Sequence, residues 1–167
     1  MAKVSRSKLA LALALLRELK AKIAYYSSMV ERNVARYREF AKRVEKIDPS
    51  RAKRAEAEAK SLEALRNHLD RLSLFIDRIL LKLETLLAVD DVASSVALLK
   101  GLVDEVKKSV AYKVPFIGVA IDSVDSLARE LVSEVRMGNE LGRGGVAIPS
   151  QEAKKVLEEA KKIAGLA

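Results

Sequence analysis

Two segments of about 40 residues each repeat apolar residues at alternating steps of three and four, and the pair Asp48-Pro49 separates them. This spacing places the apolar side chains along one face of an α-helix. Aspartate favours the N-cap position and proline the first turn, so one helix ends and the next begins with almost no loop. A connection this short makes the helices antiparallel neighbours. The sequence therefore predicts a long helical hairpin over residues 5–88.

The apolar row of the first helix, expected over residues 5–47, is typical of a coiled-coil seam sustained over six heptads. In the second helix, expected over residues 49–88, the row is unbroken from Leu62 to Leu86 and thins to alanines nearer the turn. We therefore expect a hairpin that is well packed at its open end and slim near its turn. The seam expected in the first helix consists of Leu9, Ala12, Leu16, Leu19, Ile23, Tyr26, Val30, Tyr37, Phe40, Val44 and Ile47.

Two shorter helical patterns follow the hairpin and complete the expected core. Asp90 can act as the N-cap of a third helix, whose apolar row runs from Val92 to Val110. Pro115 and Gly118 then interrupt the chain ahead of a fourth helix that is expected to end near residue 137. We expect Asp90, Pro115 and Gly118 to act as hinges between these helices.

Residues 138–149 have the glycine-rich composition of a flexible linker, and Ser150 can cap a last helix beyond it. We therefore predict an all-α chain with a helical core over residues 1–137 and a C-terminal helix over residues 150–167 that packs back on the core. The residues of this helix expected to contact the core are Val156, Leu157, Ala160 and Ile163.

The composition agrees with a helical core. Half of the residues are hydrophobic but only 4% are aromatic, which is typical of helix bundles built from Leu, Val, Ile and Ala. The chain has no cysteine, which excludes disulfides and thiolate metal sites. Asn and Gln are scarce beside abundant Lys, Arg and Glu, a pattern that favours a hyperthermophilic source.

The residue types needed for common enzyme chemistry are missing. His68 is the only histidine, so one chain cannot supply a pair of histidines or a zinc site of several histidines. No Gly-Lys-Ser/Thr motif follows the glycine-rich stretch of residues 142–145, so it is not a phosphate loop. Asp90 and Asp91 are better explained as a helix cap than as metal ligands. We therefore expect neither enzymatic activity nor a metal or other cofactor.

The positive charge is concentrated in the hairpin. Residues 1–60 contain 16 Lys and Arg against 7 Asp and Glu, while the remainder contains 15 against 16. The segment from Arg32 to Arg54 contains nine basic residues and three acidic ones. This charge either keeps a long hairpin soluble or binds an anionic partner. The candidate binding residues are Arg32, Arg36, Arg38, Lys42, Arg43, Lys46, Arg51, Lys53 and Arg54.

An anionic membrane is the favoured partner, because each basic residue near such a surface contributes about 1 kcal/mol. Nucleic acid is also a polyanion, but the basic residues are not interleaved with aromatic residues expected to stack on bases, and no nucleic-acid motif is present. No apolar run approaches the roughly 20 residues that a membrane-spanning helix requires. We expect a cytoplasmic protein that is peripheral at the inner face of the membrane.

Two stretches, Val119-Ala-Ile-Asp-Ser-Val-Asp-Ser-Leu127 and Ile148-Pro-Ser-Gln-Glu-Ala-Lys-Lys-Val-Leu-Glu-Glu-Ala160, together with the order of helices, resemble the ESCRT-III family, and in particular its archaeal cell-division members. The resemblance implies a filament subunit in cell division or membrane remodelling. It implies monomers closed by the last helix, which open and polymerise with themselves or with paralogues on membranes. It also implies disassembly by an AAA-type ATPase, although no clear docking motif follows the last helix. The alternatives are a nucleic-acid-associated protein and a static helical scaffold.

Overall fold

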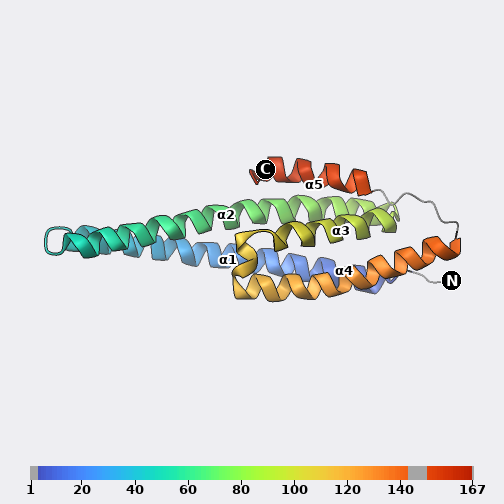
Figure 1. Cartoon of the computed structure of the whole chain (residues 1–167), viewed down its shortest axis with the longest axis horizontal. Coiled ribbons are helices and arrows are strands. Elements are labelled where there is room, and N and C mark those ends of the chain that lie inside the picture. The colour runs from blue at the N-terminus through green and yellow to red at the C-terminus, as the bar shows by residue number, and fades with distance from the viewer. Residues whose placement is uncertain (1–3, 143–149, 167) are drawn as a thin grey trace.

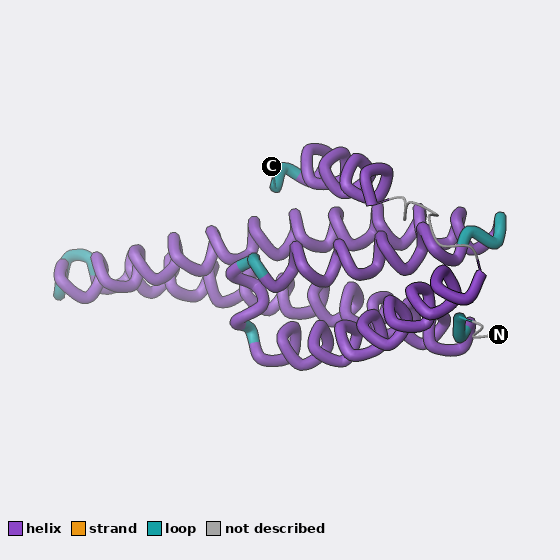
Figure 2. The backbone as a smooth tube through the Cα atoms, turned by 45° about the vertical axis from the view of Figure 1, so that its right-hand side comes forward, coloured by secondary structure: helices purple, strands orange, loops and turns teal. Residues whose placement is uncertain are grey.

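The structure is a computed structural model that describes residues 4–142 and 150–166. Within these residues every regular element is a helix, so the prediction of an all-α chain is confirmed. Two long helices lie side by side and antiparallel, and shorter helices cover one end of the pair (Figures 1 and 2). The elements are α1 (Arg6–Val44), α2 (Pro49–Ala88), α3 (Val92–Lys107), the 3₁₀ helix η1 (Val110–Lys113), α4 (Pro115–Gly142) and α5 (Ser150–Ala164).

Short side chains fix where the two long helices begin. The Ser5 side chain accepts a hydrogen bond from the backbone N–H of Lys8 at 3.3 Å and caps α1. Asp48 does the same for α2, accepting from the N–H of Arg51 at 3.2 Å, with Pro49 in the first turn. Because an N-cap satisfies a backbone donor that the helix cannot, Asp48 and Pro49 determine the point at which the chain reverses.

The main core lies where α1, α2, α3 and α4 run together. Leu16, Ile23, Leu69 and Leu99 are among the side chains fully enclosed there. At the end of this region that is nearer the hairpin turn, the ring of Tyr26 in α1 packs edge to face on that of Phe116 in α4, with ring centroids 5.3 Å apart. Beyond this pair α1 and α2 extend alone, as Figure 1 shows. We call this extension, residues 28–64, the distal hairpin.

The connection between α2 and α3 is a tight helix ending. Asp90 adopts a left-handed conformation with φ of 60°. The N–H of Asp91 donates to the carbonyl of Leu86 and the N–H of Asp90 to that of Leu87, the bonds of a Schellman motif. The cap of α3 is Asp91, whose side chain accepts from the N–H of Ser94. The expectation that Asp90 caps this helix is therefore wrong by one residue, because Asp90 is needed to end α2.

The boundaries of α4 also differ from those expected. Pro115 is its first residue, and the helix continues through Gly118 without interruption. Gly118 is required by packing, since a Cβ there would lie 2.8 Å from the carbonyl oxygen of Tyr112 in η1. The helix also continues to Gly142, so the first five residues of the expected linker are helical. Residues 143–149 lie outside the described part of the chain.

A buried carboxylate joins α3 to α4. Asp125 of α4 is 4% exposed and accepts hydrogen bonds from Lys100 at 2.9 Å and Lys107 at 2.6 Å, both on α3. Arg129 Nε lies 3.0 Å from the same carboxylate. Burial alone would raise the pKa of Asp125, but the bonds from Lys107 and Lys100 outweigh it and hold the pKa below its ordinary value. The ionised form therefore stabilises the contact between these two helices.

Replacing Asp125→Asn should lower the free energy of unfolding by about 2 kcal/mol at neutral pH, because two lysines lose their shared charged acceptor. Since the pKa of Asp125 is lowered in the folded state, its contribution is present above the unfolded pKa of about 4 and is lost as the pH falls through the folded pKa. The difference between wild type and variant should therefore shrink in acid. Chemical denaturation at several pH values measures both effects.

Asp104→Asn provides the control, since Asp104 also pairs with Lys100 but its side chain is 52% exposed. Its effect should stay within about 0.5 kcal/mol. Equal losses in the two variants would contradict the assignment of Asp125 as the main link between α3 and α4.

Candidate functional site

The distal hairpin is held together by small side chains. Val30 and Val34 of α1 pack on Ala59 of α2, and nearer the turn Ala41 packs on Ala52 and Ala55. Alanines on both helices allow the backbones to approach closely, so little side-chain volume is needed between them. The distal hairpin therefore has only a narrow apolar strip as its core.

This packing corrects the expected seam beyond Val30. Tyr37, Phe40 and Ile47 were expected to face α2, but they are 40%, 38% and 84% exposed. The buried positions are Val34 and Ala41 instead. Aromatic rings do not fit opposite the alanines of α2, so the helix presents its smaller row there and turns the larger side chains toward solvent.

Eight of the nine predicted basic residues are exposed on the distal hairpin, and no carboxylate of the described residues forms an ion pair with them. They belong to two helices and the turn between them, so the structure brings them to one end of the molecule (Figure 1). A charged group without an ion pair attracts an anion without first losing a partner. These eight residues are Arg32, Arg36, Lys42, Arg43, Lys46, Arg51, Lys53 and Arg54.

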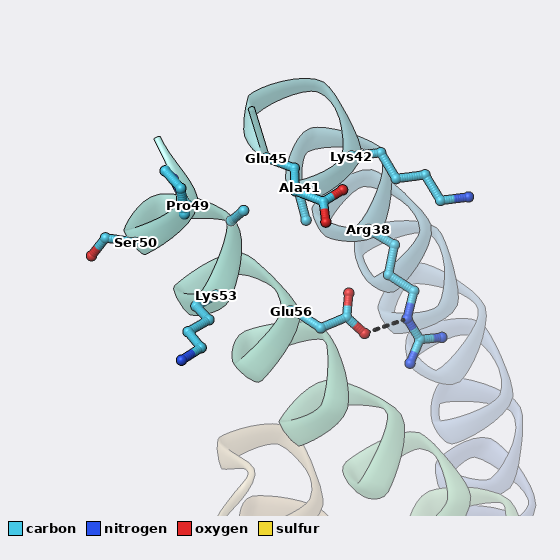
Figure 3. Close-up of a pocket in the computed structure, with 9 residues that line it drawn as sticks. Arg38, Ala41, Lys42, Glu45, Pro49, Ser50, Lys53 and Glu56 are labelled. Atoms are coloured by element: carbon cyan, nitrogen blue, oxygen red, sulfur yellow. Dashed lines mark hydrogen bonds and ion pairs between the residues drawn. The ribbon is translucent and has the colours of Figure 1, made fainter. Parts of the chain in front are cut away.

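Arg38 is the ninth and has a different role. Its Nη1 lies 2.6 Å from Glu63 and its Nε 3.4 Å from Glu56, and both carboxylates belong to α2. The hydrogen bond to Glu63 raises the pKa of Arg38 above its ordinary value. Figure 3 shows Arg38 turned toward Glu56 across the space between the helices, while Lys42 and Lys53 point outward. Arg38 therefore joins the two helices and is less available to a partner than its neighbours are.

A second candidate site is the contact of α5 with α2 and α3. Ala153, Leu157, Ala160 and Ala164 are all less than 9% exposed, and Val156 is half-buried against the main core. The expectation that Ile163 contacts the core is wrong, because its side chain is 57% exposed. At that end of the helix Ala164 is buried and Ile163 is not, so less apolar area is buried than a contact through Ile163 would give.

Leu157 is the central side chain of this contact. It occupies space left by Gly101 of α3, where an added Cβ would overlap the end of the leucine. Lys161 supports the same contact with an ion pair to Glu105 at 3.2 Å. Sequence reasoning missed Gly101, although a glycine inside a helical pattern is a signal: it costs about 1 kcal/mol relative to alanine and needs a packing reason.

His68 and the three predicted hinge residues have structural positions at or near helix ends. Nε2 of His68 and Oγ of Ser109 lie 2.8 Å apart, and burial followed by the charge of Arg71 lowers the pKa of His68. The histidine thus links α2 to the turn after α3. Asp90, Pro115 and Gly118 lie at or beside helix ends, and their role as hinges stays a prediction.

Within the described residues, no helix combines the length and the apolar character needed to cross a bilayer. The same residues bring no three His, Asp or Glu side chains together in a way that could hold a metal ion. Comparison of the chain with protein-family models, curated protein sequences and solved structures finds no match in any of the three.

Leu157→Asp should detach α5, because it removes a buried leucine worth roughly 2 kcal/mol and places a carboxylate against apolar side chains. Backbone amides of α5 should then exchange with solvent much faster, as measured by hydrogen–deuterium exchange. Ile163→Asp makes the same chemical change at an exposed position of the same helix and should leave exchange nearly unaltered. Similar exchange in both variants would contradict the described orientation of α5.

Proposed function

We propose that this chain is a peripheral membrane protein of the ESCRT-III type that assembles into filaments on anionic membranes during archaeal cell division or membrane remodelling. The observation that carries the proposal is the distal hairpin, whose eight exposed basic residues have no ion-pair partner within the described residues. Its place of action would be the inner face of the membrane.

The magnitude of the charge supports a lipid partner. Nine basic and three acidic residues between Arg32 and Arg54 leave a net charge of six. At about 1 kcal/mol for each net charge near an anionic surface, this corresponds to a dissociation constant of roughly tens of micromolar, and the binding weakens with salt. The projection of the distal hairpin beyond the other helices leaves these residues accessible to a broad surface.

Single-stranded nucleic acid is a second candidate partner, and one observation favours it. Tyr37 and Phe40 are exposed among the arginines, whereas the sequence pattern had assigned both to the seam. Exposed aromatic rings beside basic residues can stack on bases. The membrane is preferred because the distal hairpin also exposes Met29 and Ile47, which lack the flat ring that stacking requires.

We further propose that α5 keeps the monomer closed. Its contact has one leucine at its centre and alanines around it, and the entropy lost when the helix docks opposes the gain from burial. A contact of a few kcal/mol suits a switch, because a neighbouring subunit or a membrane can replace it. Self-association, association with paralogues and release by an AAA-type ATPase are parts of the same proposal.

Reversing Arg36, Lys42 and Arg43 to Glu should abolish co-sedimentation with vesicles that contain anionic lipid, while helicity by circular dichroism stays unchanged. Arg38 is left in place because it joins the two helices. Binding of the wild-type protein should fall steeply between about 0.1 and 0.5 M salt, since salt screens the electrostatic attraction. It should be absent on neutral vesicles, which have no net charge to attract the basic residues.

Reversal of Arg78, Lys108 and Lys113, which are exposed outside the distal hairpin, changes the net charge equally and is the matched control. It should retain most of the binding. Equal binding of wild type to neutral and anionic vesicles would refute the electrostatic proposal.

If α5 restrains assembly, Leu157→Asp should lower the protein concentration at which filaments form. The substitution destabilises the closed state, so a larger fraction of the chains is open and able to assemble. Light scattering and negative-stain microscopy measure this threshold. Ile163→Asp should assemble like wild type. An unchanged or raised threshold for Leu157→Asp would instead indicate that α5 contributes a contact within the filament.

A further inference from the structure

A second row of residues runs along α1 on the side away from α2. Its members recur at steps of four, three, four, four and three, so they share one face of the helix. All six are exposed, with Tyr25 at 67%, Met29 at 39% and Phe40 at 38%. We call this row the outer stripe; it consists of Tyr25, Met29, Arg32, Arg36, Phe40 and Arg43.

The outer stripe is separate from the packing of the hairpin. At about 100° per residue its centre lies roughly 140° around α1 from the buried row that contains Val30, Val34 and Ala41. It begins beside Tyr26, where α4 begins, and continues along the distal hairpin, where only α2 accompanies α1. None of the described helices is positioned to cover the part beyond Met29.

The stripe mixes apolar and cationic side chains and contains no carboxylate. Arg32, Arg36 and Arg43 have no ion pair with any carboxylate of the described residues. Two acids adjoin the stripe in sequence: Glu31, which is directed to Arg66 of α2 at 3.4 Å, and Glu39, which is exposed next to Phe40. Ile47, 84% exposed, adds an apolar side chain in the turn just beyond the stripe.

We propose that the outer stripe lies flat on an anionic lipid surface, with its arginines on phosphate groups and with Met29 and Phe40 entered between the headgroups. This inference rests on the proposed membrane function and specifies which surface makes the contact. Helices that bind in the plane of the interface combine burial of apolar side chains with attraction between basic side chains and anionic lipid. A second copy of the chain is a poor partner for this surface. Two outer stripes in contact would both be cationic and would repel each other.

The orientation follows from the same surface. If the contact were the turn alone, basic residues of α1 and α2 would contribute alike and the hairpin would stand upright. Contact through the outer stripe instead lays the distal hairpin along the membrane with α1 below α2. Residues on the outer face of α2, such as Ala57, would then remain in water.

Because the chain has no tryptophan, a single one can report on each face. Phe40→Trp should show a blue-shifted emission maximum with vesicles of phosphatidylcholine and phosphatidylglycerol, and brominated lipid should quench it. Ala57→Trp, at an exposed position on the opposite side of the distal hairpin, should show neither change. Equal shifts at both positions, or a shift at residue 57 alone, would overturn the proposed orientation.

Neutralisation of charge gives a second, independent test. Arg32, Arg36 and Arg43 to Gln should weaken the partition coefficient for these vesicles on the order of 100-fold. Arg51, Lys53 and Arg54 to Gln removes the same charge from α2 and should weaken it less than about threefold if α2 faces water. Equal weakening would overturn the inference while leaving membrane binding itself intact.

Two further outcomes separate the inference from the proposed function. Failure of the wild-type chain to bind anionic vesicles at all would refute both. Quenching of the residue-40 tryptophan by a single-stranded oligonucleotide, without any response to brominated lipid, would assign the outer stripe to nucleic acid and overturn the lipid proposal.

Discussion

The pairing of α1 with α2 is the interaction on which the rest of the molecule depends. These helices contain 39 and 40 residues, whereas α3 contains 16 and α4 contains 28. The shorter helices can cover only the open half of the pair, where large side chains fill a four-helix core. In the distal half α1 and α2 have only each other, so a narrow strip of alanine and valine must hold them. A narrow strip leaves the larger side chains of α1 outside.

Because of this constraint, the charged side chains have different roles in the two halves of the molecule. In the four-helix half, charged groups form ion pairs between helices, as Asp125 of α4 does with Lys100 and Lys107 of α3. In the distal half Arg38 alone of the nine candidate residues is used in this way. The remainder of the charge is available to a partner. The contact of α5 lies on the four-helix half, so closure of the chain and access to the basic residues involve different regions of the surface.

The helices could be predicted from the sequence, because long rows of apolar residues and the Asp48-Pro49 pair are local signals. The face that α1 presents to α2 beyond Val30 could not. Two rows of α1 have helical spacing there, one through Tyr37 and Phe40 and the other through Val34 and Ala41. Only the size of the opposing alanines decides between them, and that depends on register between distant segments. The same limit applies to Ile163, whose exposure depends on how Leu157 fits against Gly101.

The alanine packing of the distal hairpin has a mechanical consequence. The resistance of a rod to bending rises steeply with its thickness, and here a two-helix rod continues from a four-helix one. Bending forces would therefore be absorbed in the slender part, while the four-helix half keeps its shape. Helices of this length already curve gently in proteins without breaking their hydrogen bonds. The molecule is thus a stiff body with a compliant arm, and the arm carries the eight exposed basic residues proposed to bind a partner.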